Sequence, residues 1–388
     1  MKFETKAIRL QTAKSQHREH STPIFPTSSF TYESAEQMRD VFAGDEEGNI
    51  YSRFTNPSVR EFEMKMAALE ETEDAVATAS GMSAIFASFV SFLKCGDHLL
   101  VSRAVFGSTY KMMENYLQGF GIEYTFLNPS QGVEEWTEAV QENTKMLFLE
   151  TPSNPGLHIY DLENISKWCK KHNLLLNVDN CFATPYLQKP ASYGADIICH
   201  SATKFIDGQG RVLGGLVAGK KEIVEKVFNY VRSAGPSLSP FNAWVLSKSL
   251  ETLAVRMDRH CENASKLASI LQGHEEIEKV NYPFLESHPQ YAIAKKQMSQ
   301  GGAIVTFDLK KGLDGGRKFL NALQMLSLTA NLGDTRSIAS HPSSTTHRKL
   351  TEEERMELGI SPGLIRISVG LEHIDDISSD ILQALTNI

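Results

Sequence analysis

Short apolar runs alternate with amphipathic stretches over much of the chain. Runs of mostly apolar residues, typical of short buried strands, lie at 98–102, 122–127, 146–150, 174–179, 196–200 and 213–218. Between them, apolar residues at helical spacing predict helices at 108–118, 134–140 and 162–172. Strands that alternate with helices through short connections indicate an α/β fold with a mainly parallel sheet between layers of helices.

An earlier apolar run, at 75–78, is followed by Ser80, Gly81 and Met82, and then by a predicted helix that reaches residue 93. The start of a helix presents free backbone N–H groups and the positive end of the helix dipole, which suit a phosphate group. Gly81 allows a ligand to approach the backbone closely. No Gly-Lys-Ser/Thr follows, so the turn is not a nucleotide P-loop; an ordinary strand-to-helix connection is the alternative.

The pattern changes at both ends of this region. A long helical stretch at about 240–271 predicts a bridge to a second domain, with strand-like runs at 303–309 and 364–369 and helices at 315–323, 352–358 and 374–386. Residues 1 to about 50 carry little periodic signal, and such a terminus in a compact protein is usually pinned to something. We therefore expect an N-terminal arm at 1–55, a main domain at 56–240 and a smaller α/β C-terminal domain at 241–388.

Composition is that of an ordinary soluble globular protein, with 41% hydrophobic and 22% charged residues among 388. The formal net charge of −8 disfavours a nucleic-acid partner. We expect no membrane segment, because no apolar run is long enough and the polar N-terminus lacks the apolar core of a secretory signal. The scattered cysteines predict free thiols in a reducing cytoplasm, without disulfides or a metal site: Cys95, Cys169, Cys181, Cys199 and Cys261.

The polar cluster with the clearest chemistry follows the strand predicted at 196–200. It contains Ser201, Thr203 and Lys204, and glycines follow at 208, 210, 214 and 215. A lysine placed there by a buried strand can lose its proton through desolvation or a neighbouring positive charge and become an imine-forming nucleophile. The alternative is a solvated loop lysine, and this stretch alone does not separate the two.

We expect the two hydroxyls of this cluster to lie near the start of the helix predicted after residue 80. Gly81, Met82, Ser201 and Thr203 would then form a seat for a phosphate group.

A carboxylate follows the neighbouring strand run, which ends at Asp179. Ligands of parallel α/β sheets sit at the carboxyl ends of the strands. A lysine and a carboxylate at two strand ends are the pair that pyridoxal phosphate (PLP) needs. The lysine holds the aldehyde as a Schiff base, and the carboxylate keeps the pyridine nitrogen protonated so that the ring accepts electrons. Asp179 could instead cap a helix or a turn, but the spacing favours the PLP interpretation.

Several motifs along nearly the whole chain make it resemble the Cys/Met-metabolism family of PLP enzymes, which have fold type I, like aspartate aminotransferase. The family includes cystathionine synthases and lyases, methionine γ-lyase and the O-acylhomoserine sulfhydrylases. The motifs lie, in order, at 21–30 (STPIFPTSSF), 51–57 (YSRFTNP), 79–84 (ASGMSA), 150–155 (ETPSNP), 179–185 (DNCFATP), 200–205 (HSATKF) and 366–376 (RISVGLEHIDD).

The resemblance implies that the active sites are shared between subunits. Tyr51 and Arg53 match the family's pair that contacts the cofactor phosphate of the neighbouring subunit, across an interface that the N-terminal arm reaches. We therefore expect a homo-oligomer, a tetramer built from dimers. Without the match, the two residues would be a tyrosine and an arginine of a surface loop.

Three further residues match family positions around the cofactor and the substrate. Phe106 lies where most members have a tyrosine that stacks on the cofactor ring; it can stack, but it cannot serve as a phenol proton shuttle. Asn154 matches the residue that hydrogen-bonds the cofactor's 3-oxygen, although Asn before Pro is also a common turn former. Arg366 matches the arginine that binds the substrate α-carboxylate; otherwise it is paired in the interior.

The shared motifs do not choose the reaction, but the departures from them bear on it. These are Phe106, Asn331 where many members have serine, Arg336 where synthases and lyases commonly have glutamate, and the segment 343–348. The combination looks most like the sulfhydrylases, and the absence of the insertions typical of acetyl-specific members favours the succinyl-specific branch. We expect Arg336 to bind the succinyl carboxylate; the alternative is that it pairs with Asp334 and shapes the loop.

The implied activity is γ-replacement, in which O-succinylhomoserine and sulfide give homocysteine and succinate, with Lys204 as general base for both proton transfers. O-acetylhomoserine sulfhydrylase, cystathionine γ-synthase, and methionine or cystathionine γ-lyase are alternatives. An aminotransferase would share Lys204 and Asp179 but yield a keto acid. A non-enzymatic protein of this fold would lose that pair, which is present.

Overall fold

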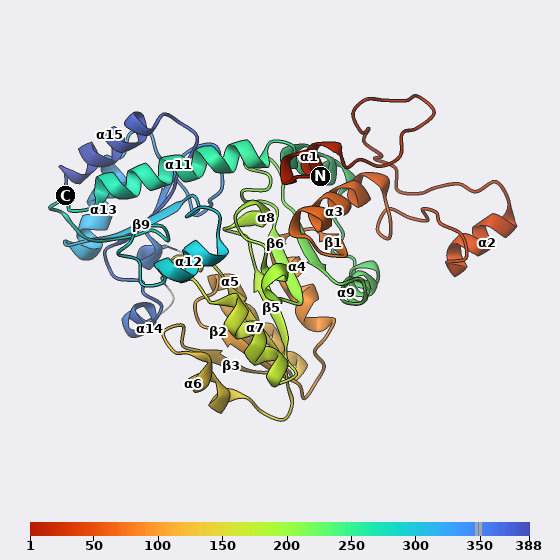
Figure 1. Ribbon diagram of the computed structural model, residues 1–388, viewed down its shortest axis with the longest axis horizontal. Helices are drawn as coiled ribbons and strands as arrows, with labels where there is room; N and C mark the ends of the chain where they lie inside the picture. Colours follow the sequence, from red (N-terminus) through yellow and green to blue (C-terminus); the bar gives the residue numbers. More distant parts are fainter. Residues whose placement is uncertain (346–347, 349–350) are drawn as a thin grey trace.

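The computed structural model describes residues 1–345, 348 and 351–388, and contains two sheets joined by long helices (Figure 1). The first sheet has the strand order β1-β7-β6-β5-β4-β2-β3. Its strands are β1 (Asp74–Thr78), β2 (His98–Ser102), β3 (Glu123–Leu127), β4 (Thr144–Glu150), β5 (Leu175–Asp179), β6 (Ile197–Ser201) and β7 (Gly215–Gly219). Strands β2 to β6 are parallel to one another, and β7 is antiparallel to both of its neighbours, so the mainly parallel α/β sheet is confirmed.

Helices cover both faces of the first sheet, because alternate residues of its strands are apolar on opposite sides. Ile197 and Cys199 of β6 pack in one core with the helices on the first face, whereas Ile198 packs in the core on the second face. The first face carries α4 (Gly81–Val90), α5 (Gly107–Met112) and α9 (Lys221–Ala234); the second carries α3 (Pro57–Glu70), α6 (Val133–Trp136), α7 (Leu162–Lys171), α8 (Thr184–Leu187) and α10 (Pro240–Leu250).

The helical stretch expected at 240–271 is two helices, α10 and α11 (Leu253–Leu271). The break follows Leu250, where the end of α10 leaves backbone carbonyls without helical partners. The Ser249 carbonyl oxygen accepts hydrogen bonds from the Thr252 N–H (3.2 Å) and from the Arg256 guanidinium (3.0 Å), so residues after the break satisfy it. The helix expected at 108–118 also changes, because α5 ends at Met112 and a short π-helix, Met113–Leu117, follows.

The second sheet has the order β10-β11-β12-β9-β8 and is covered by α11 and the C-terminal helices. Ile365 and Ile367 of β12 belong to the core of this sheet, and Arg366 between them points the other way, toward the first sheet. The remaining elements are β8 (Ile277–Asn281), β9 (Ile304–Leu309), β10 (Ser327–Leu328), β11 (Ile338–Ser340), β12 (Leu364–Ser368), α12 (Tyr291–Gln297), α13 (Gly312–Ala322), α14 (Glu352–Glu357) and α15 (Ile374–Leu385).

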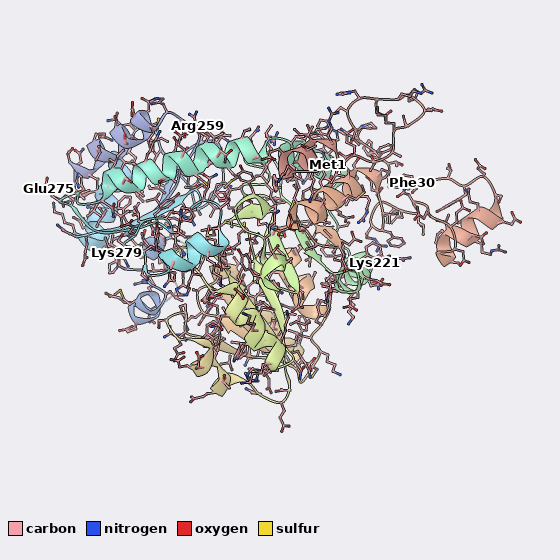
Figure 2. All side chains as sticks on the ribbon, in the orientation of Figure 1. Met1, Phe30, Lys221, Arg259, Glu275 and Lys279 are labelled. Atoms are coloured by element: carbon pink, nitrogen blue, oxygen red, sulfur yellow. The ribbon has the colours of Figure 1, made fainter. Side chains whose placement is uncertain are left out.

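After α1 (Phe3–Arg9) the N-terminal segment still contacts the body, since the Thr22 carbonyl oxygen accepts a hydrogen bond from Trp244 Nε1 (2.9 Å) and the Phe25 N–H donates to Ser58 Oγ (3.0 Å), and beyond Phe25 it projects away. Figure 1 shows α2 (Ala35–Ala43) well away from both sheets, and Figure 2 shows Phe30 in the same projecting segment. Met38 and Phe42 are exposed large apolar residues of this arm. The boundaries expected between the arm, the main domain and the C-terminal domain stay predictions. Among the described residues, no helix combines the length and the apolar character needed to cross a bilayer. The five cysteines are free thiols, and only Cys95 is exposed.

His260 of α11 is a buried histidine that gives a testable pH dependence. Its Nδ1 lies 2.7 Å from the Val369 carbonyl oxygen and donates to it, and its Nε2 is buried without a partner. Burial lowers the pKa of His260 to about 4. The unfolded chain takes up this proton near pH ~6.5, so the stability contributed by neutral His260 is complete above that pH and is lost as the pH falls toward ~4.

His260→Asn should therefore flatten the fall of Tm between these two pH values, because it keeps a donor for Val369 but cannot titrate. Melting curves across this range test the expectation, with His17→Asn on the exposed arm as the control. An unchanged slope in His260→Asn would contradict it.

Candidate active site

The carboxyl ends of the parallel strands bring the candidate residues to one edge of the first sheet. Glu150 ends β4, Asp179 ends β5 and Ser201 ends β6, and Glu150 pairs with Asp179 in the register of the two strands. Lys204 follows in the turn after β6. Because these strands are parallel and adjacent, the lysine and the carboxylate that the sequence singles out lie at the same edge.

The start of α4 lies against the end of β6. A Cβ added to Gly81 would lie 2.5 Å from the Ser201 Cβ, so only glycine permits this approach. The Ser80 side chain accepts a hydrogen bond from the Ser83 N–H, and its carbonyl accepts one from Ala84. The earlier N–H groups, on Gly81 and Met82, remain for a ligand.

Thr203 lies in the turn that follows β6. Its hydroxyl oxygen accepts a hydrogen bond from the Gly214 N–H (3.2 Å), so it is tied to the glycine-rich turn. With the start of α4 and the Ser201 hydroxyl, this arrangement fits a phosphate group.

The amine of Lys204 is half-enclosed and positioned by the second domain. Its Nζ donates a hydrogen bond to the Asn331 Oδ1. The backbone of Gly333, at φ +77°, packs on the lysine turn so closely that an added Cβ would lie 2.6 Å from the Phe205 nitrogen. Burial lowers the pKa of Lys204, and the positive charge of Arg366 acts in the same direction. The amine therefore loses its proton more readily than a solvated lysine.

Asp179 and Glu150 place two carboxyl groups in a buried site. Asp179 Oδ1 accepts a hydrogen bond from the Cys181 N–H (2.9 Å), and Glu150 Oε2 accepts one from the Phe106 N–H (2.9 Å). Burial raises the pKa of Asp179 to about 6, and burial together with the charge of Asp179 raises the pKa of Glu150 well above its usual range. A cation against Asp179 would offset this cost, and a protonated pyridine nitrogen is such a cation. The carboxylate thus fits the PLP ring.

Arg366 is a buried cation, 2% exposed, that forms no ion pair with any described residue. Its Nη1 donates to Asn154 Oδ1 (2.9 Å), and its Nη2 donates to the carbonyl oxygens of Ala330 (3.2 Å) and Asn331 (3.0 Å). Its Nε is buried without a partner. Burial lowers the pKa of Arg366 to about 10, so the guanidinium stays charged at neutral pH. An unpaired buried guanidinium is suited to bind a carboxylate.

A family model described as Cys/Met metabolism PLP-dependent enzyme matches residues 4–386. The chain belongs to this family. Its cofactor is PLP, as the lysine–aspartate pair predicts, and the fold-type I architecture of its solved relatives is also confirmed.

Curated relatives of this Cys/Met-metabolism enzyme carry two different activities. It is 47% identical over 383 residues to an O-succinylhomoserine sulfhydrylase of Pseudomonas aeruginosa, covering 99% of this chain and 95% of the relative. It is 45% identical over 387 residues to an L-methionine gamma-lyase of Fusobacterium nucleatum, covering 99% and 98%.

A solved structure described as a putative O-acetylhomoserine (thiol)-lyase of Campylobacter jejuni has a TM-score of 0.95 and 33% identity, with 100% of both chains covered. That protein carries N'-pyridoxyl-lysine-5'-monophosphate. MetB of Corynebacterium glutamicum has a TM-score of 0.93 and 36% identity, covering 100% of this chain and 98% of its own.

Arg336 lies in the loop that continues from Asn331, but it has a partner within that loop. Its Nε and Nη2 donate to the two carboxylate oxygens of Asp334 at 2.8 and 2.9 Å, and Nη2 also donates to the Gln209 carbonyl oxygen (3.2 Å). The side chain is 64% exposed. This is the arrangement that the alternative interpretation of Arg336 describes. In the segment 343–348, Thr346 and His347 lie outside the described residues.

Tyr51 and Arg53 lie at the base of the arm, where Tyr51 pairs with Ser29 and Arg53 contacts the end of α9. Tyr51 is exposed and forms an isolated β-bridge with Ser29 of the arm. Arg53 Nη1 donates to the Arg232 carbonyl oxygen at the end of α9. Their expected role, at the cofactor of a neighbouring subunit, stays a prediction.

The buried acids and amides around the site were not predicted from the sequence. Glu150 lies in a recognised motif and ends a predicted strand next to that of Asp179, which is the signal that could have identified it. Glu70 shares a fully buried hydrogen bond with His200 and accepts another from Asn180 Nδ2 (3.0 Å). It comes from α3, far away in the sequence, so local patterns give no sign of this contact.

Proposed function

We propose that this enzyme catalyses γ-replacement on O-succinylhomoserine, with sulfide as the nucleophile and homocysteine and succinate as products. The observation that carries the choice is the 47% identity, over nearly the full length, to an O-succinylhomoserine sulfhydrylase. Phe106 supports it from this chain, because a phenylalanine beside the cofactor leaves no phenol as a proton shuttle.

Each site residue has a separate role in this reaction. PLP, when bound, supplies an electron sink for the charge that develops at the substrate Cα. Asp179 keeps the ring nitrogen protonated, and Arg366 binds the substrate α-carboxylate. Lys204 Nζ, oriented by Asn331, would take the proton from Cα, pass it on to the bound cofactor so that the amine is free again, and then take a proton from Cβ. Succinate would leave Cγ with its bonding electron pair, hydrosulfide would add there, and Lys204 would return protons to Cβ and Cα. We place Phe106 against the ring face and Asn154 at the ring's 3-oxygen.

A γ-lyase is the second candidate, favoured by the 45% identity to an L-methionine gamma-lyase. The proton transfers by Lys204 are the same in both reactions, and they differ in whether a second nucleophile adds to Cγ or a keto acid is released. Product analysis separates them. The purified enzyme should prefer O-succinylhomoserine to the acetyl and phospho esters, and sulfide to cysteine as the nucleophile. It should convert this ester with sulfide faster than it converts methionine alone. Faster production of 2-oxobutyrate from methionine would favour the lyase.

The arm gives a prediction about assembly. If Tyr51 and Arg53 serve the phosphate of a neighbouring subunit, Arg53→Ala and Lys204→Ala chains should each be inactive, yet a mixture of them should recover part of the activity. Hybrid dimers contain one site that carries neither substitution, since the two residues then come from different chains. Activity after subunit exchange, followed with differently tagged chains, tests this. Exchange without recovery would place both residues in their own subunit's surface.

Arg336 gives a prediction about the ester. If Arg336 binds the succinyl carboxylate, its charge-assisted hydrogen bonds would increase the affinity about ten- to a hundredfold. Arg336→Ala should then lower kcat/KM for the succinyl ester by that factor and leave the neutral acetyl ester nearly unchanged. Equal losses on both esters would mean that the pair with Asp334 only shapes the loop.

A further inference from the structure

Two arginines from distant parts of the chain lie against one aromatic ring at the base of the arm. The guanidinium carbon of Arg53 is 4.7 Å from the ring centroid of Phe54, and that of Arg232, in the last turn of α9, is 4.2 Å from it. The hydrogen bond from Arg53 to the Arg232 carbonyl ties the arm to α9. Phe54 therefore contacts both cations.

Neither arginine has a counter-charge among the described residues. Acids are nearby, because Glu63, Asp74 and Glu225 line the same cavity as Arg232, which has a volume of about 700 Å³. Yet Arg60, in the wall of that cavity, takes both Glu63 (3.3 Å) and Asp74 (2.8 Å) as partners. Two half-buried cations that contact the same ring and have no acidic partner raise the local positive potential, which favours the binding of an anion.

We propose that Arg53 and Arg232 form a two-arginine site for an oxyanion that the neighbouring subunit's active site presents. The proposal rests on the proposed function, in which Arg53 reaches that site. Paired guanidinium donors match the oxygens of a phosphate or a carboxylate. Two groups of this chemistry are available, the phosphate of PLP and the distal carboxylate of the substrate's succinyl group. Phe54 is a positioning residue, because it touches both guanidinium groups and has no charge of its own.

Arg232→Met in the full-length holoenzyme tests the site, with two separate readouts. The first is the dissociation constant of PLP compared with that of pyridoxal, which lacks the phosphate. The second is kcat/KM for release of the leaving acid from the succinyl and the acetyl ester, which replacement and elimination both produce. Lys226→Met is the matched control, because Lys226 is a cation of the same helix that lies against Phe92.

We expect Arg232→Met either to weaken PLP binding or to lower kcat/KM for the succinyl ester, by about tenfold or more. Pyridoxal binding, or kcat/KM for the acetyl ester, should change little. Weaker binding of PLP but not of pyridoxal identifies the phosphate. A slower reaction of the succinyl but not of the acetyl ester identifies the carboxylate and would move its recognition from Arg336 to this pair. Lys226→Met should change neither readout.

Two results would overturn the proposal. One is that Arg232→Met leaves both readouts unchanged, and the other is that it weakens PLP and pyridoxal, or both esters, equally, as a structural residue would. Failure of the proposed function is recognised separately, because an enzyme that releases the leaving acid without forming homocysteine still reports on this site.

Discussion

Lys204→Ala should reduce turnover by about 10³-fold or more and leave borohydride no lysine through which to fix PLP to the protein. The amine is the only general base that we assign, and its pKa is lowered by burial and by the nearby charge of Arg366. Peptide mapping after reduction of the wild type should find the cofactor on the peptide that contains Lys204.

The matched control is Lys221→Ala, which removes an exposed lysine at the start of α9 (Figure 2). It should retain the absorbance of bound PLP, the adduct on Lys204 and the activity. A Lys204→Ala protein that is still reduced to the same covalent adduct would refute the assignment.

Asp179→Asn should keep PLP bound but lower kcat by about a hundredfold or more. The amide has nearly the shape of the carboxylate and can keep the contact with the Cys181 N–H, but it has no charge to hold the ring nitrogen protonated. Absorbance of the bound cofactor and steady-state turnover measure the two effects separately.

Asp196→Asn is the control. Asp196 lies next to the first residues of β5 and β6, at the edge of the sheet opposite to Asp179, and accepts a hydrogen bond from the Leu176 N–H (2.9 Å). We expect it to affect stability more than turnover. Unchanged kcat in Asp179→Asn would count against the assigned role.

The parallel sheet was predictable because its signal is local. Each strand buried on both faces is a continuous apolar run, and the polar residue where the run stops marks the ligand edge; Asp179 and Lys204 were found in this way. The break between α10 and α11 was not predicted, because Glu251 and Thr252 lie there instead of the Gly or Pro that usually marks a helix end, and the Arg256 contact that accompanies the break comes from the next helix.

The contacts that complete the site join distant segments. Arg366 meets Asn154 across 212 positions of sequence and Arg53 meets Arg232 across 179, so no local pattern predicts either contact. The resemblance to the family supplied roles for Arg366, Asn154 and Arg53, but it gave no sign of Arg232. The partner of Arg336 was also not predictable from the sequence, because whether its guanidinium binds a ligand or Asp334 depends on side-chain geometry within a single loop.

The products formed from O-succinylhomoserine at saturating sulfide show most directly whether the enzyme catalyses γ-replacement. One reaction of the wild-type enzyme is followed by measuring succinate, homocysteine and 2-oxobutyrate together, so that every turnover is assigned to replacement or elimination. We expect the homocysteine formed to equal nearly all of the succinate released. Succinate matched mainly by 2-oxobutyrate, or no release of succinate at all, would contradict it.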